Sequence, residues 1–306
     1  MPETAVAGFV SLGDRRNGPE YLGSPGRDVW RTFFLNPPAG MRAPQAFLIE
    51  YGPGVVLQTH FHDVDEFQVV VEGDGRLGRH LVAPCTVHHA RAWTPYGPIV
   101  AGPHGLSFLT LRAQRDSAGP RKLPEQRAAL EAAPGRTPWQ ASCRFELPTD
   151  PLSSARVERA LEDASGPLAE WVRLPAGAMH DVEPAPGGAF VALLRGSLQE
   201  EPARGEGLAL AFLPGSALPL RLTAGADGAA ALVLRFRADD GTTAPMVATV
   251  HADAWHCSLC GSVYDPRVGD PSSSLPPGTP WEAVPHDWRC PDCDAARSAF
   301  EPAPAA

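Results

Sequence analysis

The stretch GVVLQTHFHDVDEFQVVVEG, from Gly54 to Gly73, places two histidines and a glutamate between runs of β-branched residues. Similar short apolar runs, each bounded by glycine or proline, precede it in QAFLIEYGPG and follow it in GRLGRHLVAP and GLSFLTLRA. Regularly spaced short strands with such turns are typical of an all-β barrel or sandwich. The sequence therefore predicts an all-β fold over about residues 30–113.

The histidines of this stretch favour a metal site. On a strand, His60 and His62 share one face because side chains alternate with a period of two. Glu66, a short turn later, can add an oxygen ligand. A single strand histidine is usually a hydrogen-bonded core or surface residue, but packing alone seldom produces this combination. A second segment, GRHLVAPCTVHH, ends in His88 and His89.

These two segments resemble the two motifs of the cupin superfamily, over about residues 45–112. The first has the family's glycine, His-x-His, glutamate, glycine spacing; the second is looser, with Thr86 where the family usually has glycine. By register His89 matches the closing histidine, and His88 is the adjacent alternative. The resemblance implies one divalent catalytic metal, with one or two open positions, inside a small barrel. Its implied ligands are His60, His62, Glu66 and His89.

A second set of short strands, with the same succession of glycine-rich turns, includes AEWVRLPAGAMHDVEPAPGGAFVALLRGSLQ and LALAFLPGSALPLRLTAG. We interpret it as an internal repeat and predict a second, degenerate cupin-like barrel that binds no metal. It retains His180 but has no His-x-His. We expect His180 and Glu183 to be ordinary surface residues.

The end of the chain carries two C-x-x-C pairs, CSLC and CPDC, which are Cys257 to Cys260 and Cys290 to Cys293. Four soft thiolates form a tetrahedral site that selects iron or zinc. Such pairs indicate metal or redox chemistry more often than disulfides. Cys85 and Cys143 are left over, and we expect Cys85 to be a small buried residue.

The segments CGSVYDP, GDP, PPGT and DWRCPDC resemble rubredoxin, in order, over residues 253–301. The resemblance implies one iron on Cys257, Cys260, Cys290 and Cys293, and transfer of one electron at a time. Asp294 stands where glycine normally follows the second pair, and aspartate tolerates left-handed backbone geometry. A structural zinc site is the alternative. With 8 acids against 3 arginines, this region has a net charge of −5, which suits docking of a basic redox partner.

The expected domains are a metal-binding cupin barrel over residues 1–118, a connector with one short helix over 119–150, the degenerate barrel over 151–238, a linker over 239–252 and the rubredoxin-like domain over 253–301. The net charge of −9 and the absence of a basic stripe disfavour nucleic acid and anionic membranes as partners. Neither a signal peptide nor a transmembrane stretch is evident, so we expect a cytoplasmic protein.

Together these features predict an iron-dependent, oxygen-activating oxidoreductase, with Fe(II) in the cupin site and a rubredoxin iron that supplies electrons. The expected partners are a small organic substrate, molecular oxygen and a rubredoxin or ferredoxin reductase. One alternative is a zinc, nickel or manganese isomerase, lyase or bond-forming enzyme with a structural tail; another is a ligand-binding or redox-sensing protein. The substrate, the acid–base residues and the oligomeric state stay open.

Overall fold

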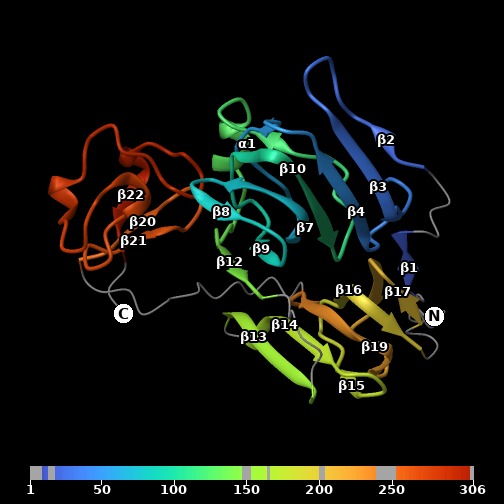
Figure 1. The fold of residues 1–306 in the computed structure, drawn as a ribbon. Coiled ribbons are helices and arrows are strands. Elements are labelled where there is room, and N and C mark those ends of the chain that lie inside the picture. The colour runs from blue at the N-terminus through green and yellow to red at the C-terminus, as the bar shows by residue number, and fades with distance from the viewer. Residues whose placement is uncertain are drawn as a thin grey trace.

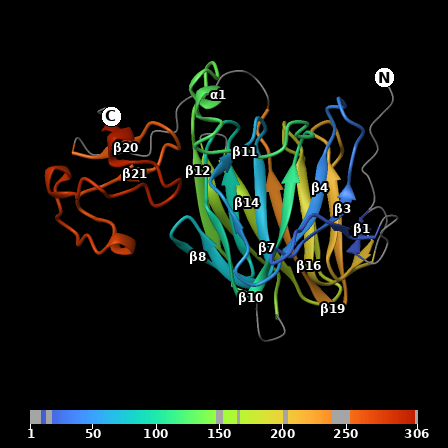
Figure 2. The ribbon, with the colours of Figure 1, turned by 90° about the horizontal axis from the view of Figure 1, so that it is seen from above.

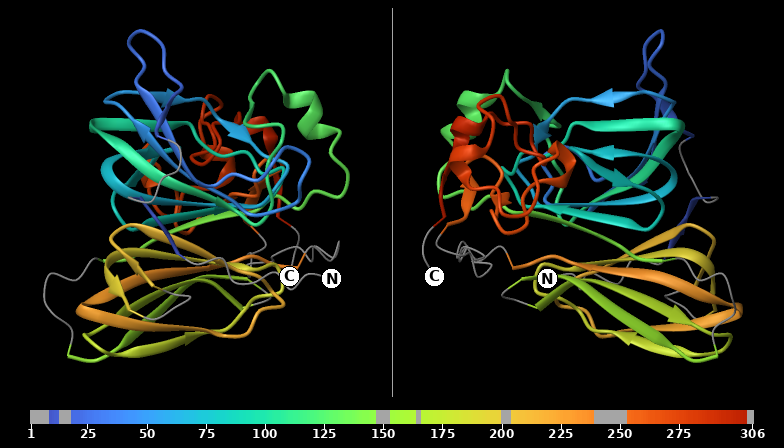
Figure 3. Two further views of the ribbon diagram at one scale, coloured as in Figure 1. Left: turned by 90° about the vertical axis from the view of Figure 1, so that its right-hand side faces the viewer. Right: turned by 60° about the vertical axis from the view of Figure 1, so that its left-hand side comes forward.

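The structure is a computed structural model that describes residues 9–12, 18–146, 153–163, 166–199, 204–238 and 253–303. These residues form two stacked β-barrels and a small third domain at the side of the first barrel (Figures 1 and 3). The predicted all-β fold is confirmed. The linker expected over 239–252 lies outside the described residues. In the described part of the chain, no helix is both long enough and apolar enough to span a bilayer.

The first barrel is an antiparallel sheet in the order β12-β9-β7-β10-β4-β3-β2, with β5 paired to β10 and β8 to β7. A short β6-β11 pair covers one end. Its strands are β2 (Glu20–Tyr21), β3 (Val29–Leu35), β4 (Gln45–Tyr51), β5 (Val56–Leu57), β6 (His60–Phe61), β7 (Glu66–Leu77), β8 (His80–Val82), β9 (Thr86–Ala90), β10 (Ile99–Arg112), β11 (Arg121–Lys122) and β12 (Gln140–Arg144).

The second barrel has the order β1-β18-β16-β19-β14-β13, with β15 paired to β19 and β17 to β16. Except for β2, which has no counterpart among the described strands, this order repeats that of the first barrel, so the predicted internal repeat is present in the topology. Its strands are β1 (Val10–Ser11), β13 (Arg156–Asp163), β14 (Gly166–Leu174), β15 (Met179–Val182), β16 (Ala189–Leu198), β17 (Gly205–Glu206), β18 (Ala209–Leu213) and β19 (Leu220–Arg235).

The edge strands correct the expected domain boundaries. β1, near the N-terminus, pairs with β18 of the second barrel, whereas β11 and β12, within the expected connector, pair with β6 and β9 of the first. The short helix expected in the connector is α1 (Arg127–Glu131). Strand pairing therefore assigns residues 121–144 to the first barrel and residues 10–11 to the second. Turn composition could not show this, because backbone hydrogen bonds that pair distant strands leave no local signal.

The two barrels share a hydrophobic core between their facing sheets. Phe67, Leu109 and Leu111 of the first barrel belong to one buried cluster with Phe190 and Leu234 of the second. The start of β7 is buried on both faces, because one face lines its barrel and the other meets the second barrel. Such strands carry continuous rather than alternating apolar residues.

The third domain is a three-stranded sheet with a compact aromatic core beside the first barrel (Figure 2). Trp255 and Trp281 stack with ring centroids 4.6 Å apart, and Trp281 also meets Trp288 edge to face. Its elements are β20 (Trp255–Cys257), β21 (Val263–Tyr264), β22 (Phe300–Pro302) and three single turns of 3₁₀ helix, Pro271–Ser273, Trp281–Ala283 and Arg297–Ala299.

Candidate metal centres and the contact between them

The two C-x-x-C loops bring four thiols together. Cys257 Sγ lies 3.8 Å from Cys293 Sγ, and Cys260 Sγ lies 3.6 Å from Cys290 Sγ. Four sulfurs at the usual metal–sulfur distance of about 2.3 Å would be separated by about 3.8 Å at the corners of a tetrahedron. None of the four cysteines is disulfide-bonded. The geometry therefore fits a tetrahedral thiolate metal site.

The residue after each pair adopts a left-handed conformation, as the sequence predicts for Asp294. Gly261 has φ 78° and Asp294 has φ 58°. The two positions differ in their surroundings. A Cβ at Gly261 would lie 2.3 Å from the Pro138 carbonyl oxygen of the first barrel, whereas Asp294 is exposed. Aspartate is therefore compatible with the second position, whereas the first requires glycine.

Electrostatics within the cysteine cluster favour a bound cation. Burial raises the pKa of Cys260 well above its usual value, and hydrogen bonds with Cys257 and Cys290 contribute to raising the pKa of Cys293, whereas hydrogen bonds with the other three cysteines lower the pKa of Cys257. Four adjacent thiolates repel one another unless a cation holds them together. Metal binding and deprotonation of these cysteines are therefore coupled.

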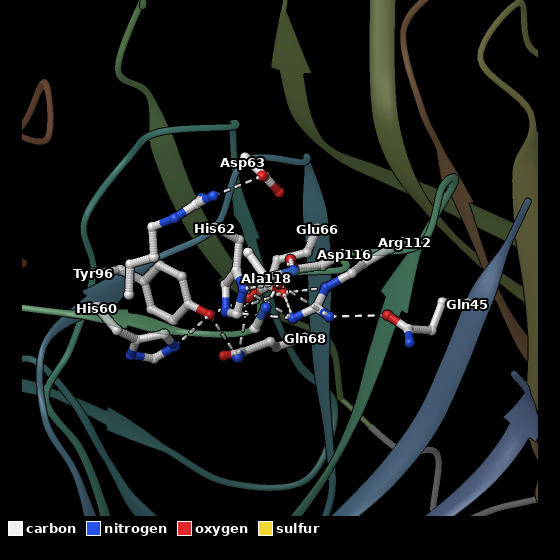
Figure 4. A network of polar contacts seen from close by, with 12 residues as sticks. Gln45, His60, His62, Asp63, Glu66, Gln68, Tyr96, Arg112, Asp116 and Ala118 are labelled. Carbon is white, nitrogen blue, oxygen red and sulfur yellow. Dashed lines mark hydrogen bonds and ion pairs between the residues drawn. The ribbon is translucent and has the colours of Figure 1, made fainter. Parts of the chain in front are cut away.

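In the first barrel, His60, His62 and Glu66 place one ligand atom each within 4.8 Å of one another. All three side chains are buried, with at most 4% of their surface exposed. His60 belongs to β6, His62 follows it, and Glu66 begins β7 (Figure 4). The structure thus brings together three of the four predicted ligands.

Oxygen acceptors hold the two histidine rings. His60 Nδ1 lies 2.9 Å from the Gln58 carbonyl oxygen, and His62 Nδ1 lies 2.5 Å from Asp116 Oδ2. A histidine that binds a metal through one ring nitrogen commonly donates the N–H of its other ring nitrogen to such an acceptor, which fixes the tautomer. The Nε2 atoms of both rings point into the cluster, where His60 Nε2 lies 3.0 Å from the Tyr96 hydroxyl and His62 Nε2 lies 3.3 Å from Arg112 Nη2. Two imidazoles and a carboxylate are a donor set that fits a divalent metal.

The structure does not bring His89 into this cluster, which corrects the predicted ligand set. The side chains of β9 alternate: His89 packs against Phe67 and Trp139, on the side facing the second barrel. His88 points to the barrel interior, where its ring centroid lies 5.0 Å from that of Tyr96. The family register selects His89, but two adjacent strand residues cannot both face inward.

The Nδ1 atom of His88 is held by an oxygen atom, as are those of His60 and His62. Its Nδ1 lies 2.9 Å from Ser142 Oγ of β12, and its buried Nε2 has no hydrogen-bond partner among the described residues. His89 Nδ1 also lacks a partner within the described chain, but its ring lies between aromatic side chains. His88 is therefore the fourth residue of the site that best fits a ligand role.

The imidazoles of His60 and His88 are held neutral. Burial lowers the pKa of His60 to about 3, assisted by the neighbouring His62, and burial also lowers the pKa of His88 to about 4. Burial alone would raise the pKa of Glu66, but His62, Arg112 and a hydrogen bond from Tyr96 outweigh it and lower the value to about 2. Neutral imidazoles and an ionised carboxylate are the forms that bind metals.

Three further side chains complete the network, and sequence reasoning assigned none of them to the metal site; it offered Tyr96 as a pocket or core residue. Arg112, the last residue of β10, places Nη2 2.7 Å from Glu66 Oε2 and Nη1 3.0 Å from Gln45 Oε1. Tyr96 donates its hydroxyl proton to Glu66 Oε1, and its oxygen lies 3.0 Å from His60 Nε2 (Figure 4). Asp116, which is also buried, holds His62. Alternation along GLSFLTLR is the signal that puts Arg112 on the inner face; no local pattern indicates Tyr96 or Asp116.

The metal-binding end of the third domain faces the first barrel. Arg136 donates to the Ser258 and Leu259 carbonyl oxygens of the first cysteine loop, at 2.6 and 3.2 Å. The Pro291 and Asp292 carbonyl oxygens of the second loop accept hydrogen bonds from barrel amides. All four cysteines are at most 3% exposed. The thiolate end is therefore covered by the barrel.

Barrel residues also use part of the acidic face of the third domain. His80 Nε2 lies 2.6 Å from Asp292 Oδ1, and Arg79 pairs with Asp270 at 3.4 Å. His80, which matches no motif position, thus helps to hold the third domain against the first barrel. A cavity of about 660 Å³ lies at this contact and is lined from both sides, with His88, Gln140 and Ser142 from the barrel and Tyr264, Asp270 and Trp288 from the third domain.

The remaining predicted residues lie apart from both centres. His180 is half-buried on β15, and Glu183 is exposed. His104, to which the sequence assigns no motif, is exposed and pairs with Asp74. Cys85 is buried in the core between the barrels, as predicted, and Cys143 is half-buried on β12. Among the described residues, the second barrel contributes no cluster of three metal-binding side chains.

Comparison with known proteins separates the two parts of the chain. Residues 254–300 match the family model described as Rubredoxin. A probable rubredoxin HupI from Rhizobium leguminosarum bv. viciae is 52% identical over 52 residues, which are 17% of this chain and 74% of that protein. Rubredoxin-2 from Pseudomonas aeruginosa is 47% identical over 47 residues, 15% of this chain and 86% of that protein.

The barrels resemble oxalate decarboxylase from Bacillus subtilis. Its structure at pH 4.6 has a TM-score of 0.51 and 14% identity, over 78% of this chain and 79% of that one. A structure of the same enzyme, studied for its Mn(II) centres, has a TM-score of 0.52 and 15% identity, over 78% of each chain. At this identity the likeness concerns the fold, which is that of a bicupin.

Proposed function

Because the C-terminal domain belongs to the rubredoxin family and the two barrels have the cupin fold, we propose that the chain is an iron-dependent oxidoreductase. In this proposal the first barrel activates oxygen at a metal site and acts on a small organic molecule. The rubredoxin domain, which implies an iron at its cysteines, supplies electrons to that site. A reductase outside the chain reduces the rubredoxin.

The observation that carries the proposal is the orientation of the rubredoxin domain. Its cysteine loops lie against the first barrel, through Arg136 on one loop and Arg79 on the other. Phe61, between the two histidines of the metal cluster, packs into the same hydrophobic cluster as Cys257 and Cys260. A tail with a purely structural role does not require its thiolate end to face the barrel that carries a metal-binding cluster.

The residues proposed to hold the barrel metal are His60, His62, Glu66 and His88. When bound, a divalent iron would supply open coordination positions for oxygen and substrate. The chain holds the His60 and His88 imidazoles neutral, fixes His62 through Asp116, and keeps Glu66 ionised through His62 and Arg112.

Charge at the site favours an anionic substrate. Glu66 and Asp116 contribute two negative charges and Arg112 one positive charge, so the protein part has a net charge of −1. A divalent cation reverses this to +1. Because a bound cation is commonly the largest local charge in its site, a substrate carboxylate would be attracted to it.

A non-redox metal enzyme with a structural tail is the second candidate. The observation that favours it is the fold shared with B. subtilis oxalate decarboxylase, for which Mn(II) centres are described. Metal analysis of the purified protein separates the candidates. We expect two iron atoms per chain and a red ferric tetrathiolate absorption that bleaches on reduction; zinc in the tail and no iron in the barrel would refute the proposal.

Replacing one cysteine tests whether the tail supplies electrons. Cys290→Ser should destroy the thiolate site, because a hydroxyl is a poor substitute for a soft thiolate ligand, and should leave the barrel loaded. The chemically reduced variant should complete a first turnover but fail to sustain turnover driven by a nicotinamide-dependent rubredoxin reductase. Wild type should sustain it. Equal product per enzyme over many cycles in both proteins would show that the tail is not an obligate relay.

A further inference from the structure

We propose that electrons pass from the rubredoxin centre to the barrel centre through the Asp292 carbonyl, the Gly97 amide and the Tyr96 side chain. This inference rests on the proposed function and specifies the route within it. It names Tyr96 as the residue that connects the domain contact to the metal-binding side chains.

The first part of the route is the contact between the second cysteine loop and the barrel. The Gly97 amide donates to the Asp292 carbonyl oxygen at 3.0 Å, and the Arg79 amide donates to the Pro291 carbonyl oxygen at 2.9 Å. A Cβ at Gly78 would lie 2.2 Å from the Pro291 oxygen. The loop backbone therefore lies directly on the barrel backbone, and Asp292 is bonded through its carbonyl carbon to the nitrogen of Cys293.

The second part of the route is Tyr96, the residue before Gly97. Its side chain is fully buried, and its hydroxyl contacts two of the candidate ligands, His60 Nε2 at 3.0 Å and Glu66 Oε1. Its backbone also forms a reciprocal pair with that of His60, with N–O distances of 3.0 and 3.1 Å. The Tyr96 hydroxyl also accepts a hydrogen bond from Gln68 at 3.1 Å.

These parts form one connected path. It runs from Cys293 Sγ along the Cys293 backbone to the Asp292 carbonyl, across one hydrogen bond to Gly97, through Tyr96, and across a second hydrogen bond to Glu66. The other contact between the centres runs through Trp93 and Phe61, whose ring centroids lie 5.6 Å apart. Through the Trp93 backbone this contact also reaches a candidate ligand: the Trp93 amide donates to the His62 carbonyl oxygen at 2.7 Å, and the Trp93 carbonyl accepts from Arg136, which also donates to the Leu259 carbonyl oxygen of the first cysteine loop. That route crosses three hydrogen bonds and the Tyr96 route crosses two, so we expect the Tyr96 route to couple the centres better.

The transferred species is one electron. With iron in both sites, the tetrathiolate iron would be oxidised from ferrous to ferric as the electron leaves, and the barrel iron would be reduced from ferric to ferrous as the electron arrives. No bond is made or broken, and no proton has to move. The external reductase then restores the ferrous tetrathiolate.

The test compares Tyr96→Phe with the matched aromatic variant Trp93→Phe in the full chain loaded with iron. The rubredoxin is photoreduced while the barrel iron is ferric, and recovery of the red absorption gives the rate of internal electron transfer. Loss of the ferric barrel signal by electron paramagnetic resonance is followed in parallel. Midpoint potentials of both centres and the iron content are measured for each protein.

We expect Tyr96→Phe to slow the transfer by about tenfold or more, without a matching change in potentials, by analogy with the ~10–100-fold loss of metal affinity or activity on losing a hydrogen-bonded partner of a metal ligand. Trp93→Phe should stay close to wild type. Where Tyr96→Phe loses barrel iron, Gly97→Ala tests the same path: a Cβ there would lie 3.3 Å from Thr59 Cα on a backbone with φ 107°, which displaces the amide from Asp292.

Transfer at the wild-type rate in Tyr96→Phe, or in Gly97→Ala where the first variant lacks iron, would overturn the route. So would slowing in Trp93→Phe alone, or slowing fully accounted for by altered potentials. Absence of internal transfer in wild type would instead overturn the proposed function, and the route with it.

Discussion

The two barrels have the same strand order but different interiors. Phe67 pairs with Leu111 in the first barrel, and Phe190 pairs with Leu234 in the second. These equivalent pairs align the strands of the two barrels residue by residue. By this register, four polar residues of the first interior have small or apolar counterparts in the second. The pairs are Glu66 and Ala189, Gln68 and Val191, His88 and Ala211, and Thr110 and Val233.

Equivalent positions that carry similar residues in the two barrels are those whose side chains face the other barrel. Phe67 and Phe190 both lie in the core between the barrels, and His89 corresponds to Phe212, which packs against the same core. Burial of apolar surface therefore maintains the fold in both barrels, while a few inward positions decide which barrel can bind a metal. The following predictions are ordered by their expected effect on barrel metal.

Replacing a metal-ligand residue should leave the first barrel without metal, as we expect for the second barrel. We expect His60→Ala and Glu66→Gln to lose about one metal atom per chain and all activity, while the rubredoxin keeps its iron, because these residues belong to the first barrel alone. Glu66→Gln also breaks the buried pair with Arg112 and should lower stability by about 3–5 kcal/mol. Metal analysis and thermal unfolding measure both effects. Full metal content in both variants would mean that the site lies elsewhere.

The neighbouring histidines of β9 provide a sharper comparison. His88→Ala should weaken barrel metal binding by more than about tenfold. His89→Ala should leave metal binding intact and lower stability by about 0.5–3 kcal/mol, because its ring packs between Phe67 and Trp139. Metal titrations and denaturant unfolding of the two variants give the answer. The reverse result would restore His89 as the ligand.

A core substitution in the second barrel should affect stability alone. Leu193 is fully buried in the apolar interior of that barrel. Leu193→Ala should destabilise the protein by about 2–5 kcal/mol through the cavity that it leaves, with unchanged content of both metals in the folded protein. Loss of metal from the folded variant would indicate that the second barrel takes part in the site.

The smallest effect is expected at His180, the histidine that the second barrel retains. It is half-buried on β15 and belongs to no metal cluster among the described residues. His180→Ala should change neither metal content nor activity, and stability by no more than about 0.5 kcal/mol, as is usual for surface positions. A lower barrel metal content would contradict the assignment of the second barrel as metal-free.

Much of this molecule follows from local sequence. Turn residues and short apolar runs determine an all-β fold, because they act over a few residues. The C-x-x-C loops and their flanking segments determine the rubredoxin domain, since each loop directs two thiolates by its own geometry. The left-handed backbone conformation at Asp294 is likewise determined by its position directly after the second C-x-x-C pair. His60 and His62 meet because they are two residues apart.

Tertiary structure decided the rest. Whether His88 or His89 faces inward depends on how β9 pairs with β7, since a shift of one residue exchanges the two faces. Arg112, Asp116 and Tyr96 join the site from distant positions, and the exchange of edge strands crosses the domain boundaries that turn composition suggests. The contact of Gly97 with Asp292 joins two domains across nearly 200 residues of sequence. Such contacts arise only when distant surfaces pack, so no local pattern encodes them.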